Sequence, residues 1–339
     1  MRAQDLREKL SLFSLLIAVK RMKKIGIIGG GFGLYGYVPA AFESGLEVHT
    51  LQKYKAQIAA RPDISGLFSV LHFHSDITAL IAATDILALA VTPQLQEQII
   101  TEFKTELSGK RLILEKPLSK NNDSSLRFLQ SLQENGSECY FGFLAPYTSW
   151  FQELSHLLLD QKNTGQVKMK WHFHSAAFAT QKEPSWKASI GQGGGCLYFY
   201  ACHLVYCLAL LDQWNISAAR RSFLHSDLDT KLILKAQSER FELELEIDAL
   251  SRKEAQFVVQ ANSSHGALSF SDKSIFKQPE NYQDPDPRIR GLKSLLDQSK
   301  REQYHPSHCM NAKKYLKFEA DILQDSVAFQ KGGSGGTFA

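Results

Sequence analysis

The first half of the chain alternates short apolar runs with stretches of helical periodicity. Runs rich in Ile, Val and Leu break directly into glycine, proline or polar residues, which is typical of strands buried on both faces of a sheet. The predicted strands span residues 24–28, 47–51, 70–73, 85–91, 111–114 and 138–143. Strands that alternate with helices predict a doubly wound parallel sheet of the Rossmann type, here over residues 22–145.

The pattern changes after Pro146, where several strands follow one another in series. The segment 241–248 alternates strictly, so its apolar side chains share one face and its acidic side chains share the other. Consecutive strands predict an open, mostly antiparallel sheet with helices on one face, and residues 146–330 are assigned to this second domain. The other elements predicted here are a helix at 150–159, a strand at 167–178, a helix at 197–211 and a helix at 311–329.

The two ends of the chain stand apart from these domains. Residues 331–339 are glycine-rich and are expected to form a flexible tail. Residues 1–21 are an N-terminal extension whose apolar part, 10–19, is too short to span a bilayer. Lysine and arginine follow it where small residues would mark signal-peptide cleavage. We therefore expect a cytoplasmic protein without a membrane partner, in which the extension is an extra helix or precedes a true start at Met22.

Composition and charge narrow the class of protein. With 44% hydrophobic and 22% charged residues, the chain has the composition of a globular protein. The net charge of +4 is spread along the sequence, so no basic stripe for nucleic acid is expected. The five cysteines form no CxxC pair, and their odd number argues against a disulfide framework.

A glycine-rich turn directly follows the first predicted strand, in the sequence IGIIGGGFGLYG. Such a turn before a helix lets a pyrophosphate approach the backbone and face the positive end of the helix dipole. Two registers of a dinucleotide motif fit, one starting at Gly29 and one at Gly31. We prefer the first, because the tight turn should begin where the strand ends. The alternative is a glycine turn without a ligand. The expected cofactor contacts here are Gly29, Gly31, Phe32 and Gly33.

The end of the second strand bears on the choice between NAD and NADP. Enzymes that prefer NAD place an acid there, which binds the ribose hydroxyls. Here the strand runs into Gln52 and Lys53, with Lys55 and Arg61 further on. A cation suits the 2′-phosphate of NADP, so NADP is slightly favoured. The alternative interpretation is an exposed basic turn.

Four segments together resemble the Gfo/Idh/MocA oxidoreductases, which act mostly on sugars, sugar nucleotides and cyclic polyols. They are IGIIGGGFGLYGYVPA, ALAVTPQ, LILEKPLS at Leu112–Ser119 and GGGCLYFYACH at Gly193–His203. The resemblance implies that Thr92 and Pro93 line the nicotinamide side of the cleft. It also implies that Lys116 lies where cofactor and substrate meet, and we expect Glu115 beside it to orient the lysine. A lysine at the carboxyl end of a parallel strand can stabilise negative charge on a substrate oxygen.

The last of these segments departs from the family pattern. The family places an aspartate one helical turn before a histidine, but here Phe199 precedes His203. Acid and base chemistry would then fall to His203, to Lys116, or to Tyr198 or Tyr200. The competing interpretation is a histidine buried in an apolar helix without a catalytic role.

Two further residues distinguish the expected substrate pocket from the pocket of the family that the chain resembles. Gln96 stands where many members have histidine, and Pro146 stands where an arginine often follows the sixth strand. Aromatic walls suit a sugar ring or a nucleotide base, although an ordinary core also contains them. The expected walls are Trp150, Trp186, Lys187, Tyr198, Tyr200 and His203.

Two histidine pairs have the spacing that puts both rings on one face of a strand. They are His72 with His74 and His172 with His174. No third ligand is expected near either pair, so both are interpreted as structural and no metal is predicted.

These observations favour an NAD(P)-dependent oxidoreductase that acts on a hydroxyl or carbonyl group of a sugar-like small molecule. In it, Lys116 would polarise the oxygen and His203 would carry the proton. One alternative is a catalytically silent Rossmann protein that senses a ligand. Another is an enzyme that uses tightly bound NAD for transient oxidation during elimination or glycoside cleavage. A homo-oligomer through the open face of the C-terminal sheet is a further expectation.

Overall fold

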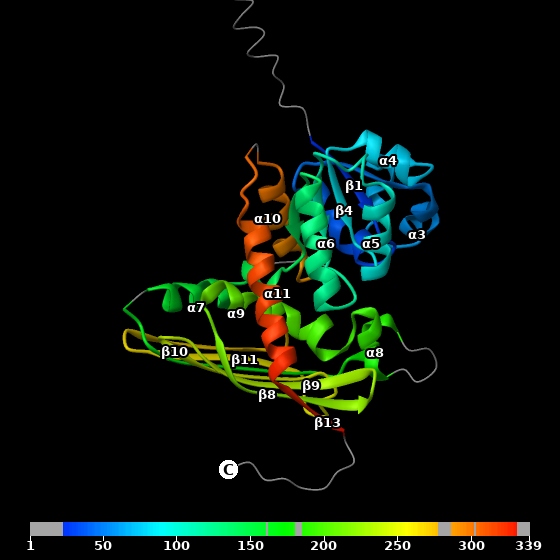
Figure 1. Ribbon diagram of the computed structural model, residues 1–339. Coiled ribbons are helices and arrows are strands. Elements are labelled where there is room, and N and C mark those ends of the chain that lie inside the picture. Colours follow the sequence, from blue (N-terminus) through cyan, green and yellow to red (C-terminus); the bar gives the residue numbers. More distant parts are fainter. Residues whose placement is uncertain (1–22, 161, 180–184, 277–285, 302, 331–339) are drawn as a thin grey trace, which may run out of the picture.

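Six short strands form a parallel sheet in the N-terminal half of the computed structural model (Figure 1). The structure describes residues 23–160, 162–179, 185–276, 286–301 and 303–330. The strand order, β3-β2-β1-β4-β5-β6, is that of a doubly wound dinucleotide-binding sheet, which confirms the predicted fold class. The strands are β1 Lys24–Ile28, β2 Glu47–Leu51, β3 His72–His74, β4 Ile86–Leu89, β5 Arg111–Leu114 and β6 Glu138–Phe141.

Side-chain caps fix where three helices beside this sheet begin. Asp76 accepts a hydrogen bond from the N–H of Ala79 (2.8 Å), and Asn121 accepts one from Ser124 (2.9 Å). Thr92 caps the helix after β4 in the same way, and Pro93 follows as its first residue. The helices of this half are α2 Val38–Glu43, α3 Lys55–Ala59, α4 Ile77–Ala83, α5 Pro93–Glu102 and α6 Asn122–Glu134.

The second sheet has seven strands in the order β12-β11-β7-β10-β9-β8-β13. Four neighbouring pairs are antiparallel, whereas β10 with β7 and β13 with β8 are parallel. Helices α7, α9 and α11 lie on one face of this sheet (Figure 1), as predicted. The strands are β7 Gly165–His172, β8 Asn215–His225, β9 Leu228–Gln237, β10 Phe241–Asp248, β11 Gln256–Ser263, β12 Gly266–Asp272 and β13 Ser326–Gln330. The helices are α7 Ser149–Leu159, α8 Ala176–Ala179, α9 Cys202–Leu211, α10 Ile289–Ser299 and α11 Ser307–Asp325.

Strand β10 shows the alternation that the sequence predicts. Its four apolar side chains are buried, and its acidic side chains lie on the other face. Lysines on neighbouring strands pair with two of these acids: Lys168 with Glu244 (3.3 Å) and Lys231 with Glu246. Two of the four acids on this face are therefore neutralised within the sheet itself.

Two predicted ends are wrong, and one predicted helix begins with a different helical geometry. The strand predicted at 167–178 ends at His172, because the neighbouring strand β10 ends at the paired residue Asp248. The helix predicted at 197–211 begins as a π-helix, Cys196–Ala201. The last helix ends at Asp325, and the chain then adds β13 to the edge of β8. This pairing joins distant segments, so helical periodicity could not reveal it.

Helix α10 returns to the N-terminal sheet although it lies within the predicted second domain. Its residues Ile289 and Leu292 share a hydrophobic cluster with Ile25 and Ile27 of β1, and the helix packs against α2. The chain therefore crosses between the two sheets more than once. This crossing brings residues beside α10 close to the ligand end of the first sheet.

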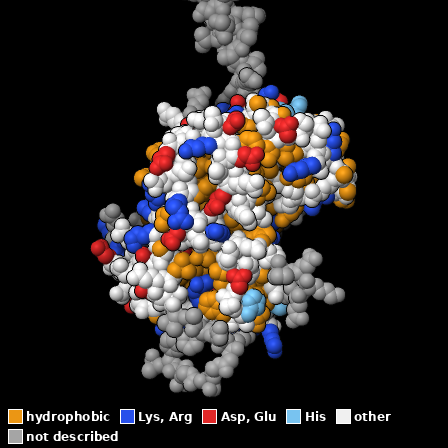
Figure 2. All heavy atoms as spheres, turned by 45° about the vertical axis from the view of Figure 1, so that its right-hand side comes forward, with side chains coloured by type: hydrophobic (Ala, Val, Ile, Leu, Met, Phe, Trp, Pro, Cys, Tyr) orange, Lys and Arg blue, Asp and Glu red, His pale blue; other side chains and the backbone are white. Residues whose placement is uncertain are grey.

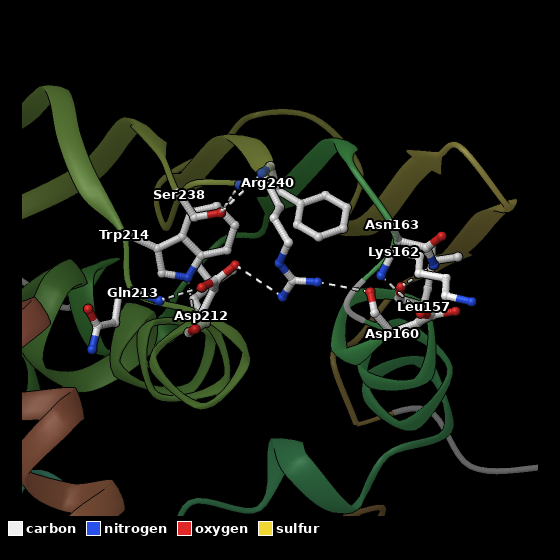
Figure 3. A network of polar contacts seen from close by, with 11 residues as sticks. Leu157, Asp160, Lys162, Asn163, Asp212, Gln213, Trp214, Ser238 and Arg240 are labelled. Atoms are coloured by element: carbon white, nitrogen blue, oxygen red, sulfur yellow. Dashed lines mark hydrogen bonds and ion pairs between the residues drawn. The ribbon is translucent and has the colours of Figure 1, made fainter.

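Arg240 ties the ends of two helices to the second sheet (Figure 3). Its guanidinium donates to the carbonyl oxygen of Asp160 (2.9 Å) after α7 and pairs with the carboxylate of Asp212 (3.5 Å) after α9. A positive charge near helix C-termini is favourable, because the carbonyl groups there carry partial negative charge. The same end of α9 is closed by Trp214, whose indole N–H donates to the carbonyl oxygen of Leu208 (2.9 Å).

The proposed extension at 1–21 and the proposed tail at 331–339 lie outside the described residues. Among the helices that the structure does describe, none has the combination of length and hydrophobicity that crossing a membrane requires.

A buried aspartate holds the π-helix that leads into α9. Asp229 accepts hydrogen bonds from the backbone N–H groups of Cys196 (2.8 Å) and Leu197 (3.3 Å) and from Nε of Arg221 (3.0 Å). Gly195 precedes them with a φ of 86°, and a Cβ there would lie 2.1 Å from the Asp229 carboxylate. Both the glycine and the aspartate are therefore needed to start this helix.

Replacing Asp229 with alanine is expected to lower the free energy of unfolding by about 3–5 kcal/mol, because Arg221 would be left buried without its partner. Urea unfolding followed by circular dichroism measures this loss. The matched control is Asp297→Ala, which removes an exposed carboxylate paired with Lys300 and should cost less than about 0.5 kcal/mol. Equal effects of the two substitutions would contradict the structural role of Asp229.

Candidate functional site

A cavity of about 440 Å³ lies at the carboxyl ends of β1, β4 and β5. This is the end of a doubly wound sheet where ligands bind, and the volume suits a small-molecule site. Its walls come from both halves of the chain. Hydrophobic side chains gather with basic ones below the N-terminal part on the face drawn in Figure 2. The described residues that line the cavity include Gly29, Gly30, Gly31, Phe32, Tyr35, Tyr54, Ala90, Thr92, Glu115, Lys116, Trp186, Lys187, Phe199, His203 and Arg288.

The glycine turn forms one wall of this cavity. Gly29 has a φ of 150°, and a Cβ on it would lie 2.2 Å from the carbonyl oxygen of Ala90. A Cβ on Gly31 would meet no atom within 4 Å. The turn is thus closed on the side of β4 and open at Gly31, where a phosphate could approach the backbone. These features agree with the register that begins at Gly29.

The helix after the turn differs from the prediction. Residues Gly33–Tyr37 form a π-helix, which continues as α2. Gly33 faces inward, where its Cβ would lie 3.3 Å from Cβ of Ala90, and it does not line the cavity. Gln57 supports the turn from α3 by donating a hydrogen bond to the carbonyl oxygen of Gly30.

Gln96 holds the segment that carries Lys116. Its amide donates to the carbonyl oxygens of Glu115 (3.2 Å) and Leu118 (3.0 Å), and its side-chain oxygen accepts from the N–H of Glu115 (3.0 Å). The peptide bond between Lys116 and Pro117 is cis. The sequence singled out Gln96 as a departure from the family, but the structure gives it a positioning role.

Lys116 contacts the residue that replaces the family aspartate. Its Nζ donates to the carbonyl oxygen of Phe199 (3.0 Å) and lies 4.1 Å from the centre of the Phe199 ring. Lys187 approaches the same ring at 5.1 Å. Burial lowers the pKa of both ammonium groups, and the charge of Lys116 lowers that of Lys187 further. The Phe199 ring thus lies beside two cations.

Glu115 is bound to a tyrosine beneath the glycine turn. The hydroxyl of Tyr37 donates to its carboxylate (2.7 Å). Burial raises the pKa of both groups. Within the described residues, no ion pair joins Glu115 to Lys116, so the expected direct orientation of Lys116 by Glu115 is not seen. Gly142 leaves room for this carboxylate, since a Cβ there would lie 2.6 Å from it.

His203 lies in the first turn of α9, buried and facing the cavity. Its ring meets the ring of Phe276 edge-on at 5.1 Å. Burial lowers the pKa of His203 well below its ordinary value, and the charges of Lys116 and Arg288 lower it further. In the part of the chain that the structure describes, its Nδ1 has no hydrogen-bond partner. A neutral imidazole therefore lines the cavity, with its Nδ1 buried and unpaired.

Sequence reasoning missed Arg288. Its guanidinium lies 4.0 Å from the centre of the Phe32 ring and pairs with Asp286 (2.6 Å). It also approaches the hydroxyl of Tyr35 (3.4 Å). Arg288 reaches the glycine turn because α10 packs on α2, and no local sequence pattern signals this contact.

Several predicted site residues lie outside the cavity. Gln52 and Lys53 are exposed in the turn after β2, where Lys53 stands 5.2 Å from the ring of Tyr54, itself a cavity residue. Pro93 starts α5 behind Thr92. The cavity is therefore lined by the adjacent residues Tyr54 and Thr92, and not by Lys53 or Pro93.

Some of the predicted aromatic wall residues line the cavity, and others do not. Trp186 lines the cavity and meets Phe199 edge-on at 5.3 Å. Tyr198 is buried and does not line it. The hydroxyl of Tyr200 hydrogen-bonds Ser175 (2.5 Å), and Trp150 is a core residue that donates to the carbonyl oxygen of Ile275 (2.9 Å).

The interpretation of His72 and His74 as a pair without a third ligand nearby is wrong. Strands β2 and β3 are parallel neighbours, and they bring Glu47 and His49 beside His72. The sequence offered a signal, because Glu47 and His49 have the same spacing on the adjacent strand. For the other pair, His172 lies 3.6 Å from Glu246.

Comparisons with known proteins agree with this architecture. No protein-family model and no curated protein matches the chain. Among solved structures, a myo-inositol dehydrogenase from Corynebacterium glutamicum gives a TM-score of 0.67 at 12% identity, covering 90% of this chain and 96% of that one. WlbA from Thermus thermophilus, in complex with NAD and UDP-GlcNAcA, gives 0.62 at 14%, covering 92% and 97%. KijD10, a 3-ketoreductase from Actinomadura kijaniata in complex with NADP and TDP-benzene, gives 0.68 at 10%, covering 91% and 99%. This likeness establishes the fold alone.

We expect Lys116 to titrate below the ordinary lysine value of about 10.4, because burial lowers its pKa. NMR of the chain labelled with ¹³C at lysine Cε measures this, with the signal assigned by its loss in Lys116→Arg. Glu115→Gln should lower the pKa further, because the Glu115 charge raises it. A midpoint at or above the ordinary value would contradict the desolvated site.

Proposed function

We propose that the chain is an NAD(P)-dependent oxidoreductase of the Gfo/Idh/MocA type, acting on a hydroxyl or carbonyl group of a sugar, sugar nucleotide or polyol. One observation carries the proposal: the glycine turn and Lys116 face the same cavity at the carboxyl ends of the parallel strands. Residues 22–145 would hold the dinucleotide, and residues 146–330 would supply most of the substrate wall.

The residues of the glycine turn fit a dinucleotide. Gly31 leaves its backbone open to the cavity, and Gly29 closes the turn against Ala90. These residues would hold the pyrophosphate, with Phe32 and Thr92 beside it. The bound nicotinamide would accept or donate a hydride, while the chain supplies binding, orientation and proton transfer.

Lys116 and His203 would carry the proton chemistry. The lowered pKa of Lys116 makes its proton easier to release, so its ammonium can donate to a substrate oxygen and exchange a proton with it. His203 is neutral, and its buried Nδ1, which has no partner among the described residues, would have to turn towards the cavity to accept a hydrogen bond from a substrate hydroxyl. Phe199 cannot transfer protons, so its ring would shape the pocket and hold Lys116 through its π face.

The positive charges around the cavity favour an anionic substrate. Lys116, Lys187 and Arg288 all line it, and positive charge suits a phosphate or a carboxylate. Among the structural neighbours, WlbA was solved with UDP-GlcNAcA, an acidic sugar nucleotide. An anionic sugar derivative is therefore the substrate class to test first.

Lys116→Ala is expected to lower turnover by about 10²-fold or more, a size typical of losing acid or base help. The binding of NADH or NADPH should change little, because the glycine turn remains intact. Nicotinamide fluorescence measures both quantities, with a panel of sugars and sugar nucleotides as substrates. Lys104→Ala, which removes an exposed lysine in the turn after α5, is the control. Unchanged turnover in Lys116→Ala would overturn the mechanism.

Lys53→Glu tests the slight preference for NADP. If Lys53 meets the 2′-phosphate, the substitution should weaken NADPH binding about tenfold relative to NADH, since a hydrogen bond to a charged group contributes about 1.5–3 kcal/mol. Fluorescence titration of the variant with each cofactor gives the ratio. An unchanged ratio would leave Lys53 as an ordinary surface lysine.

Phe199 also favours a second candidate, a dinucleotide-binding protein without turnover. Its ring occupies the space beside Lys116 in which a carboxylate could take part in proton transfer. Under this candidate the chain would bind NADH or NADPH but exchange no hydride with any sugar or sugar nucleotide. Loss of nicotinamide fluorescence on adding a substrate would exclude it.

A further inference from the structure

A cluster of three imidazoles and one carboxylate lies on the face of the first sheet that α4 covers. The parallel register pairs His49 with His72 and Leu51 with His74. Because every second residue of a strand points the same way, Glu47 and His49 on β2 share a face with His72 and His74 on β3. The cluster is separate from the cavity that contains Lys116, whose described lining includes none of these four residues.

The ligand atoms of three of these residues already have metal-like spacing. Oε1 of Glu47 lies 2.9 Å from Nε2 of His49 and 3.6 Å from Nε2 of His72. The three atoms all lie within 4.8 Å of one another. At metal–ligand distances of about 2.0–2.2 Å, the ligands of a tetrahedral zinc ion are about 3.3–3.5 Å apart. Small side-chain movements would therefore admit the ion.

His74 supplies the support that a metal-binding histidine needs. Its Nε2 lies 2.8 Å from Nδ1 of His49, and the two rings stack with their centres 5.1 Å apart. A histidine that binds a metal through one ring nitrogen usually donates a hydrogen bond through the other, which fixes the tautomer. If Nδ1–H of His49 donates to His74, the lone pair of its Nε2 points at Glu47 and His72.

The cluster contains one carboxylate, and a carboxylate together with imidazole nitrogens is a donor set that binds a cation. One cation competes, because Nζ of Lys24 lies 3.3 Å from the same carboxylate oxygen.

We propose that Glu47, His49 and His72 form a zinc site, with His74 as the hydrogen-bond acceptor behind His49. Two histidines and one carboxylate are a ligand set that zinc takes, and the fourth position would hold water. His72 has an exposed side chain (55%), so the ion can enter from solvent. The bound ion would join β2 to β3, the edge strand of the sheet.

The first test is a calorimetric titration of the full chain with ZnCl₂ after treatment with a chelator. We expect saturable binding of one ion per chain and a rise in the melting temperature, because a ligand that binds the folded state stabilises it. His72→Ala should weaken binding at least tenfold and abolish the rise. Absence of saturable binding, or equal binding by His72→Ala, would overturn the proposal.

Further variants separate the roles within the cluster. His74→Ala should weaken zinc binding by about 10- to 100-fold, as loss of a supporting hydrogen bond does. Lys24→Gln should tighten it, because the competing charge is removed. His265→Ala removes an exposed histidine of the β11–β12 turn and should leave binding unchanged. Far-UV circular dichroism checks that each variant folds.

Cobalt provides a spectroscopic readout of the ligands. Co²⁺ in a tetrahedral site has intense visible absorption, which the full chain should show and His72→Ala should lose. The alternative is a metal-free histidine cluster, in which Glu47 and His74 satisfy both ring nitrogens of His49. An unchanged visible spectrum on adding Co²⁺ would favour that alternative and overturn the zinc site.

Discussion

The candidate site depends on one close approach between two backbone segments. At the end of β1, Gly29 passes so near the carbonyl oxygen of Ala90 that a Cβ would lie 2.2 Å from it. This contact brings the glycine turn against the end of β4, and β5 follows β4 in the sheet order. Gln96 then fixes the segment beyond β5 through three hydrogen bonds. The position of Lys116 relative to the turn follows from these backbone contacts rather than from the lysine itself.

Periodicity and turn chemistry made most of the fold predictable from sequence. Apolar runs that end in glycine or proline identified the strands of the first sheet, and the alternation of 241–248 identified β10. The edge strand β13 and the packing of α10 on α2 were not predictable in this way. Both depend on contacts between segments far apart in the chain, and local patterns carry no information about such contacts.

The candidate site was predictable where residues belong to a motif, and less so elsewhere. Gly29, Lys116 and His203 follow motif spacing, and all three line the cavity. Arg288 joins them because of the crossing between the two halves, and Gln96 acts through a side chain that no motif specifies. Tyr198 is a predicted wall residue whose side chain is buried and does not line the cavity.

The apolar ring of Phe199 affects the balance of charge in the cavity. The acidic groups nearest to it are already engaged, Glu115 with Tyr37 and Asp286 with Arg288. Glu115 opposes the positive charge of Lys116, but the described lining also includes Lys187 and Arg288. A bound pyrophosphate or anionic substrate would supply further negative charge there. A bound anion would favour the protonated form of Lys116, so ligand binding would be coupled to the protonation of this lysine.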